Sequence, residues 1–254
     1  MFGSTASRLA LSGSDIDVLV MNTGDTFIYD KCVKLLSESQ LFESIDDIRT
    51  AEVPIITAEH KATGISIDFV FNREDGLKGL ALVRTLMEEY PEMRHMYFVI
   101  KSLLKLKRLH KLYHGGIGSF VLVNMIVFYL QSQHKQYKGQ QRYLQDHIID
   151  FFELYSKQMD MKQVGLSIRE GGFTFHKEHE YLCKEGNMAG EFKLCIESPL
   201  SPIDDIGGGI RKIGIIKRLF ALANQAIKTN LLLSNSFVLL AVPDAHKLRD
   251  KFHD

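Results

Sequence analysis

The sequence has few cysteines and no excess of charge of either sign. Its 254 residues carry 31 basic and 31 acidic side chains, so the formal net charge is zero. A neutral protein lacks the global positive field that attracts nucleic acid to a whole surface, and any polyanion site must be a local basic patch. Three widely spaced cysteines exclude a small disulfide-stapled scaffold and favour a reducing compartment.

The sequence also lacks a long uninterrupted apolar run. The two longest apolar stretches, Ile117–Leu130 and Leu231–Val242, each contain polar residues. Neither reaches the roughly 18 apolar residues that a membrane-spanning helix needs, and the first residues do not form a signal peptide. We therefore expect a soluble intracellular protein that does not contact a membrane. A content of 45% hydrophobic and 24% charged residues excludes a disordered or collagen-like chain.

The spacing of apolar residues predicts mixed strands and helices in the first third of the chain, followed by a mostly helical part. In the first part we predict strands at 15–21, 53–57 and 65–71, a turn at 62–64 and a helix at 28–39. In the second part we predict helices at 76–89, 93–111, 120–131, 147–157 and 213–230, with loops or short strands at 165–195.

Three aspartates in the predicted strands indicate a metal site. Asp15 and Asp17 are two residues apart, so a strand turns both carboxylates to the same face. Asp68 lies in an apolar strand, where a charge is costly unless something binds it. If the strands at 15–21 and 65–71 are neighbours, the three carboxylates meet. Carboxylate oxygens are the ligands that Mg²⁺ prefers in proteins.

A glycine and a serine precede these carboxylates. Gly3 offers a backbone that can approach a phosphate closely, and Ser4 adds a hydroxyl donor. Each feature is common by itself, since a D-x-D sequence is usually a solvated loop and a G-S pair is usually a turn. The combination of G-S, a strand that carries D-x-D, and a strand aspartate about fifty residues later is far more specific.

The segment FGSTASRLALSGSDIDVLV resembles the G-S…D-x-D signature of the DNA polymerase β-like nucleotidyltransferases, and among them the noncanonical poly(A) polymerases of the TRAMP type. Further blocks follow in that family's order: VPIIT, ISIDFVF, FVIKSLLKLKRLHKLYHGGIGSFVLVNMIVFYLQ, IIDFFELYSK and LCIESPLSPIDDIGGG. The resemblance implies an α+β fold. A catalytic palm, a mixed sheet with helices, would span residues 1–73. A helical central domain would span 74–254, with a PAP-associated nucleotide-recognition segment at about 190–230.

The activity that the resemblance implies is template-independent addition of adenylate from ATP to an RNA 3′ end. Asp15 and Asp17 would hold two Mg²⁺ or Mn²⁺ ions, and Asp68 would bind the ion that activates the RNA 3′-hydroxyl for attack on the α-phosphate. Gly3 and Ser4 would contact the triphosphate. The resemblance also implies nuclear RNA processing, surveillance and decay, with a zinc-knuckle RNA-binding protein and an RNA helicase as partners.

Later blocks would supply the remaining nucleotide contacts. By position these are Asp75 and Gly76 near the ribose, Lys101 and Lys105 at the triphosphate, Ser119 and Phe120 at a phosphate and the base, and Asp204, Asp205 and Gly208 in the recognition segment. Many relatives have Asn at positions 75 and 204 and Arg at 208, so these departures concern base selectivity rather than the reaction. Phe120 has a second interpretation as a core residue. For Lys107, Arg108 and Lys111 a solvated basic face is the favoured interpretation.

Several alternatives stay open. An RNA uridylyltransferase, or another terminal nucleotidyltransferase, would share these blocks, although residues 203–209 lack the histidine that many uridylyl-adding relatives have there. In the family a strand and helices precede the F-G-S sequence, whereas here Met1 directly precedes Phe2. We therefore expect either an N-terminally truncated sequence or an inactive fragment that binds RNA or protein. The long helical part disfavours transfer to a small molecule.

A zinc site is a further alternative. His176, His179, Cys183 and Cys195 have a spacing that is loosely compatible with tetrahedral zinc. However, Cys195 falls in the family block LCIESP, which favours packing as a small apolar residue.

Overall fold

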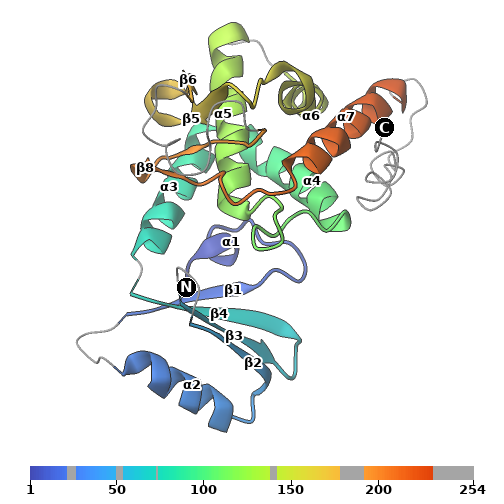
Figure 1. Ribbon diagram of the computed structural model, residues 1–254. Helices are drawn as coiled ribbons and strands as arrows, with labels where there is room; N and C mark the ends of the chain where they lie inside the picture. The colour runs from blue at the N-terminus through green and yellow to red at the C-terminus, as the bar shows by residue number, and fades with distance from the viewer. Residues whose placement is uncertain (22–26, 50–53, 73, 138–141, 178–191, 231–254) are drawn as a thin grey trace. The chain divides into compact units, whose positions relative to one another are not determined.

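The computed structural model describes residues 1–21, 27–49, 54–72, 74–137, 142–177 and 192–230 (Figure 1). The chain divides into two compact units, Met1–Thr85 and Leu86–Asp254. The division falls within helix α3 (Asp75–Glu89). The domain boundary at residue 73 stays a prediction.

The first unit is built on a four-stranded mixed sheet. Its strands are β1 (Ile16–Val20), β2 (Phe42–Ile48), β3 (Ile55–His60) and β4 (Ile65–Phe71), in the order β1-β4-β3-β2. β1 and β4 are parallel, and the other two pairs are antiparallel. The parallel pair confirms that the strands predicted at 15–21 and 65–71 are neighbours. Together with the helical second unit, this sheet confirms the α+β fold class.

Two elements of the first unit were not predicted. The edge strand β2 reads FESIDDI and is exposed along most of its length, so it lacks the apolar alternation that identifies a half-buried strand. Acidic residues on an edge strand also oppose pairing with another chain. The other element is the short helix α1 (Gly3–Ala6), which precedes β1. Helix α2 (Ile28–Glu38) ends one residue before the predicted end.

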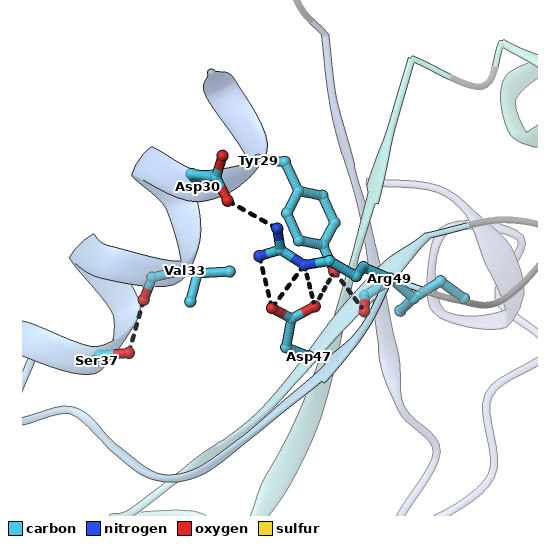
Figure 2. A network of polar contacts seen from close by, with 7 residues as sticks. Tyr29, Asp30, Val33, Ser37, Asp47 and Arg49 are labelled. Atoms are coloured by element: carbon cyan, nitrogen blue, oxygen red, sulfur yellow. Dashed lines mark hydrogen bonds and ion pairs between the residues drawn. The ribbon is translucent and has the colours of Figure 1, made fainter. Parts of the chain in front are cut away.

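A polar network fastens α2 to the sheet (Figure 2). The Tyr29 hydroxyl donates to Asp47 Oδ1 at 2.7 Å. Arg49 donates to both Asp47 oxygens, from Nε to Oδ1 at 3.2 Å and from Nη2 to Oδ2 at 2.7 Å. Arg49 Nη1 also donates to Asp30 on α2 at 2.9 Å, and its guanidinium lies 4.8 Å from the centre of the Tyr29 ring. Partial burial and the bond to Asp47 raise the pKa of Tyr29. The network therefore connects α2 with the end of β2.

We expect Tyr29→Phe to lower the Tm by roughly 2–4 °C, because it removes a hydrogen bond to a carboxylate and keeps the ring. Thermal unfolding followed by circular dichroism measures this. The matched control is Ser37→Ala on the same helix, where the hydroxyl only donates back to Val33 O (Figure 2). Because such a bond adds no tertiary contact, the control should leave the Tm unchanged. An equal loss in both variants would contradict this role for Tyr29.

The second unit is mainly helical. Beyond α3, its helices are α4 (Glu92–Leu106), α5 (Ser119–Tyr137), α6 (Leu144–Glu153), a π-helical turn at Leu154–Gln158 and α7 (Ile213–Asn230). Helix α5 is buried without a break over eleven residues from Val121 to Gln131, which explains why its sequence is apolar on all sides. Among the described residues, no helix combines the length and the apolar character needed to cross a bilayer.

Aromatic side chains from α5, α6 and α7 form the core of this unit. Phe151 contacts three of them, with ring centres 6.0 Å from Tyr129, 4.8 Å from Tyr155 and 5.7 Å from Phe220. All four rings are almost completely buried. Short strands complete the unit, namely β5 (Val164–Ser167), β6 (Phe173–His176), β7 (Glu197–Ser198) and β8 (Ser201–Asp205). They lie in or next to the segment 165–195 predicted as loops or short strands.

Three predicted helices have clearly different ends in the structure. The helix predicted at 120–131 is too short, because α5 continues to Tyr137. The helix predicted to reach residue 111 is too long, because α4 ends at Leu106. Arg108 has a left-handed φ of 55°, and Leu109 N donates to Leu104 O at 2.8 Å, which is the closing bond of a Schellman motif. The helix predicted at 147–157 begins at Leu144 and changes to π-helical geometry at Leu154.

Candidate active site

Two of the three predicted carboxylates lie side by side on the sheet. Asp17 of β1 is the register partner of Asp68 of β4, so the two side chains leave neighbouring strands at the same level. Thr57 on β3 is in turn the register partner of Asp68, and its hydroxyl donates to Asp68 Oδ1 at 2.7 Å. Asp15 lies just before the start of β1. Neighbouring strands therefore position Asp17 and Asp68 and fix the orientation of Asp68.

The backbone of Gly3 lies directly against the Asp17 carboxylate. Phe2 N donates to Asp17 O at 3.0 Å, which brings the start of α1 beside β1. Gly3 has a φ of 68°, and a Cβ placed there would be 1.8 Å from Asp17 Oδ2. Only glycine satisfies both conditions, since it tolerates left-handed φ and has no side chain. The sequence predicted a close approach by the Gly3 backbone, and the group approached here is Asp17. The contacts of Gly3 and Ser4 with a phosphate stay predictions.

Burial and neighbouring like charges both disfavour the ionised form of Asp17. Burial, and then repulsion from Asp68 and Asp15, raise the pKa of Asp17 from 3.8 to about 6. Two carboxylates that share a site destabilise each other's ionised forms. The ionised form of Asp17 is therefore costly when no cation is bound.

The donor chemistry of the three aspartates fits a divalent cation. They supply only carboxylate oxygens, the ligand type of Mg²⁺ and Mn²⁺, and an excess of negative charge that a cation would neutralise. Within the described ranges, however, no three His, Cys, Asp or Glu side chains are spaced to hold a metal ion as they stand. Asp17 and Asp68 would thus form the centre of the ligand set, which would close only when the side chains adjust around an ion.

The burial of the Asp17 carboxylate and its repulsion by Asp68 and Asp15 predict that Asp17→Asn stabilises the metal-free protein. With EDTA at about pH 7.5, we expect the free energy of unfolding to rise by about 1–3 kcal/mol, the range that a shift of this size allows. Because the folded state holds the Asp17 proton more tightly than the unfolded chain, wild-type stability lost above pH 6 returns as the pH falls towards 3.8. The gain of the variant should shrink over the same range. Urea unfolding at several pH values measures it, and a gain independent of pH would contradict the assignment.

The residues predicted near the ribose begin helix α3. Asp75 is its first residue, and a Cβ at Gly76 would lie 2.7 Å from Cδ2 of the Phe2 ring. Gly76 is therefore required for the packing of Phe2, whatever it contacts besides. Arg84, further along α3, donates to Ala6 O at 3.1 Å and so ties α1 to the same helix. The contact of Asp75 and Gly76 with a ribose stays a prediction.

The second unit contains the residues predicted at the triphosphate and the base. Lys101 is only 8% exposed, and its Nζ donates to His110 O at 2.9 Å. It therefore stabilises the loop after α4 in addition to any role with phosphate. Lys105 is half-buried near the end of α4. Ser119 is the first residue of α5, and Phe120 is half-buried whereas the eleven residues after it are buried. The contacts of these four residues with a nucleotide stay predictions.

One prediction about the basic face is wrong. Lys107, the residue that caps the C-terminus of α4, is buried, with 6% exposure, rather than solvated. Arg108 and Lys111 are exposed, as expected of a solvated face.

The recognition segment places its two aspartates differently. Asp204 is exposed on β8, and Gly208 is exposed in the turn that follows. Asp205 Oδ1 instead accepts hydrogen bonds from Ile196 N at 2.8 Å and Gly207 N at 2.7 Å, and burial raises its pKa. Asp205 therefore ties the turn after β8 to the residue that precedes β7, whereas Asp204 faces solvent. Recognition of a base by either residue stays a prediction.

Sequence reasoning missed Thr57 and Lys177. The only signal for Thr57 was its place in the block VPIIT, because its contact with Asp68 follows from the register of β3 and β4. Lys177 is buried, and its Nζ donates to Met161 O and Lys193 O, both at 2.7 Å. Of the zinc alternative, His179 and Cys183 lie outside the described residues, and Cys195 is buried.

Two family models match the chain. Residues 1–88 match the central palm domain of mitochondrial-like poly(A) RNA polymerases, and residues 144–203 match the Cid1 family of poly(A) polymerases. Poly(A) RNA polymerase protein 1 of Eremothecium gossypii is 31% identical over 97% of this chain and 40% of its own length. The chain spans only 33–40% of the first three curated relatives.

Solved structures share the fold. The polymerase core of TRAMP, an RNA surveillance complex, has a TM-score of 0.78 and 27% identity over 99% of this chain and 80% of that one. The Cid1 poly(U) polymerase has a TM-score of 0.74 and 19% identity over 95% of this chain and 85% of that one, which is a likeness of fold alone. From these matches and from the paired aspartates on β1 and β4, we conclude that the chain belongs to the noncanonical poly(A) polymerases of the nucleotidyltransferase superfamily.

Proposed function

We propose that the chain is a nucleotidyltransferase that adds adenylate from ATP to RNA 3′ ends without a template. The observation that carries the proposal is the pairing of Asp17 with Asp68 on parallel strands, with Asp15 close enough to raise the pKa of Asp17. A two-metal enzyme that joins a hydroxyl to a phosphate holds its cations with such a group of oxygen ligands. The sequence relatives named poly(A) RNA polymerase support adenylate as the group transferred.

In this proposal Asp15, Asp17 and Asp68 hold Mg²⁺ or Mn²⁺. Bound there, such ions would lower the pKa of the RNA 3′-hydroxyl and neutralise the pyrophosphate that leaves. The protein's own contribution is position. Thr57 fixes one oxygen of Asp68, and the absence of a side chain at Gly3 leaves room for the Asp17 carboxylate. Side chains held by their neighbours lose little freedom on binding, which favours catalysis.

Selectivity for adenine depends on a carboxylate, Asp204, where many relatives have an amide. Asp204 can accept a hydrogen bond from the adenine amino group, but unlike asparagine it cannot also donate one. The runner-up is an RNA uridylyltransferase, which shares the fold of the Cid1 poly(U) polymerase. A third candidate is an inactive chain that binds RNA or protein.

Partners and location follow the same relatives. The likeness to the polymerase core of TRAMP supports a TRAMP-like assembly and a role in nuclear RNA surveillance. The specific partners we propose are a zinc-knuckle RNA-binding protein and an RNA helicase. A catalytic chain without net positive charge holds RNA weakly by bulk attraction and would gain from such a partner.

The test is extension of a 5′-labelled RNA oligonucleotide by the full chain, with each of the four NTPs supplied separately. We expect extension with ATP to exceed extension with UTP, CTP and GTP. Preference for UTP would replace the adenylyltransferase with the runner-up. No extension with any NTP, in Mg²⁺ or in Mn²⁺, would support the inactive chain.

A further inference from the structure

The loop between α4 and α5 displays an aromatic side chain to solvent. This α4–α5 loop, residues 107–118, carries Tyr113, which is 82% exposed. The ring of His114 lies beside it, with ring centres 5.3 Å apart and planes at 68°. A tyrosine ring exposed to this extent contributes little to the stability of the fold. Its face is instead available for a ligand.

The loop that carries Tyr113 is held in one shape by internal bonds. Lys101 Nζ donates to His110 O at 2.9 Å, and Ile117 N donates to Leu109 O at 2.8 Å across the base of the loop. A Cβ at Gly116 would lie 2.2 Å from Leu109 O, so the chain packs there without room for a side chain. The loop therefore presents Tyr113 from a fixed support, which lowers the entropic cost of binding.

A second segment braces the loop. Arg211, which precedes α7, donates from Nη2 to Tyr113 O at 2.8 Å, and Lys212 N donates to Gly115 O at 2.9 Å. Figure 1 shows this segment, in orange, running beside the green α4–α5 loop. Arg211 and Lys212 come directly after the turn that follows β8, and a Cβ at Gly209 in this turn would touch the Leu112 side chain. The exposed aromatic thus lies beside the part of the recognition segment that leads from β8 to α7.

The two segments that meet here are free of acidic residues. Between residues 93 and 145 the sequence has nine Lys and Arg residues and no Asp or Glu. Between residues 206 and 230 it has five Lys and Arg residues and again no Asp or Glu. In a chain with no net charge this is a strong segregation of charge. Arg108, Lys111 and Arg211 are all exposed on or beside the loop. The two segments at Tyr113 therefore carry basic side chains and no acidic ones, a composition that favours an anionic ligand.

We propose that Tyr113, with Arg108, Lys111 and Arg211, forms a binding platform for single-stranded RNA. One base stacks on the Tyr113 ring, and the three cations contact the phosphates on either side. An exposed aromatic among cations is the arrangement that holds single strands without reading their sequence. The cationic surroundings favour a polyanion over a protein partner. The proposal rests on the proposed function in one respect, since RNA is the substrate there as well.

The test is binding of fluorescein-labelled oligoadenylate to the full chain, followed by fluorescence anisotropy in EDTA and without ATP. We expect Tyr113→Ala to weaken binding by about fivefold to a hundredfold, the range for loss of one stacked base. Tyr113→Phe should bind within about twofold of wild type, because the stacking ring remains. The matched control is Tyr143→Ala, which removes a tyrosine that is 76% exposed next to Asp146 and should have no effect.

The cations are tested through the salt dependence. We expect Lys111→Ala to reduce the slope of log K against log salt by about 0.7, as for one lost phosphate contact. Lys162→Ala, at an exposed lysine near Asp160, should leave the slope unchanged. The proposal would be overturned if the wild-type chain did not bind the oligonucleotide, or if Tyr113→Ala bound it as tightly as wild type. The second result would point to a protein partner for this surface. Because binding is measured without metal or ATP, an inactive chain can pass this test and an active chain can fail it.

Discussion

The variant Asp17→Asn is expected to lose nucleotidyl transfer by at least about a thousandfold, the scale on which charged groups stabilise such transition states. The substitution keeps the size of the side chain and removes the charge that would hold a divalent cation. The loss of activity should be accompanied by a gain in stability, because the same variant should be more stable than wild type in EDTA. An inactive but stabilised variant is what removal of a functional repulsion produces.

The matched control is Asp46→Asn on β2 of the same sheet. Asp46 is exposed and pairs across strands with Thr57 rather than with another carboxylate. We expect it to keep wild-type extension rates. Rates for both variants come from gel-resolved extension of a labelled RNA at saturating ATP. Activity of Asp17→Asn within about tenfold of wild type would remove Asp17 from the proposed metal site.

The variant Gly3→Ala is expected to lower activity by about a hundredfold, the loss associated with a displacement of about 1 Å in an active site. A methyl group at this position would lie 1.8 Å from Asp17 Oδ2, so the carboxylate or the backbone must move. A positive φ at the same residue adds about 1 kcal/mol of strain. The measurement is again RNA extension, together with the Tm of the variant.

Gly64→Ala separates the two effects. Gly64 has nearly the same φ, 63° against 68°, but a Cβ there would have no contact closer than 3.7 Å. Gly64→Ala should therefore introduce a similar backbone strain and lower the Tm by a similar amount. It should leave activity unchanged. If both glycine variants lose activity equally, backbone strain explains the loss and the contact of Gly3 with Asp17 does not.

The part of the site on the first unit could be predicted well from the sequence. A short β-branched apolar run identifies β1, and the alternation of apolar residues identifies β4. Each strand carries an aspartate. The pairing of Asp17 with Asp68 followed from the assumption that the two strands are neighbours, which the sheet confirms. The edge strand β2 gave no such signal, because its exposed acidic residues do not alternate with apolar ones.

Features that depend on the three-dimensional structure could not be predicted from the sequence. Nothing in the run KLKRLHK marks the left-handed turn at Arg108, so the periodicity continued the helix past its end. Likewise, the adjacent residues Asp204 and Asp205 look equivalent in the sequence. Only the backbone donors at Ile196 and Gly207 distinguish a carboxylate that holds a turn from one that faces solvent.

The most direct test of the central claim is the fate of labelled phosphate in a reaction of the full chain with RNA and ATP. Transfer of the nucleotidyl group predicts that label at the α-phosphate of ATP appears at the RNA 3′ end in the presence of Mg²⁺ or Mn²⁺. Label at the γ-phosphate should appear only in pyrophosphate. Absence of α-label from the RNA, or incorporation of γ-label into it, would contradict the claim that the aspartates of β1 and β4 serve a nucleotidyltransferase.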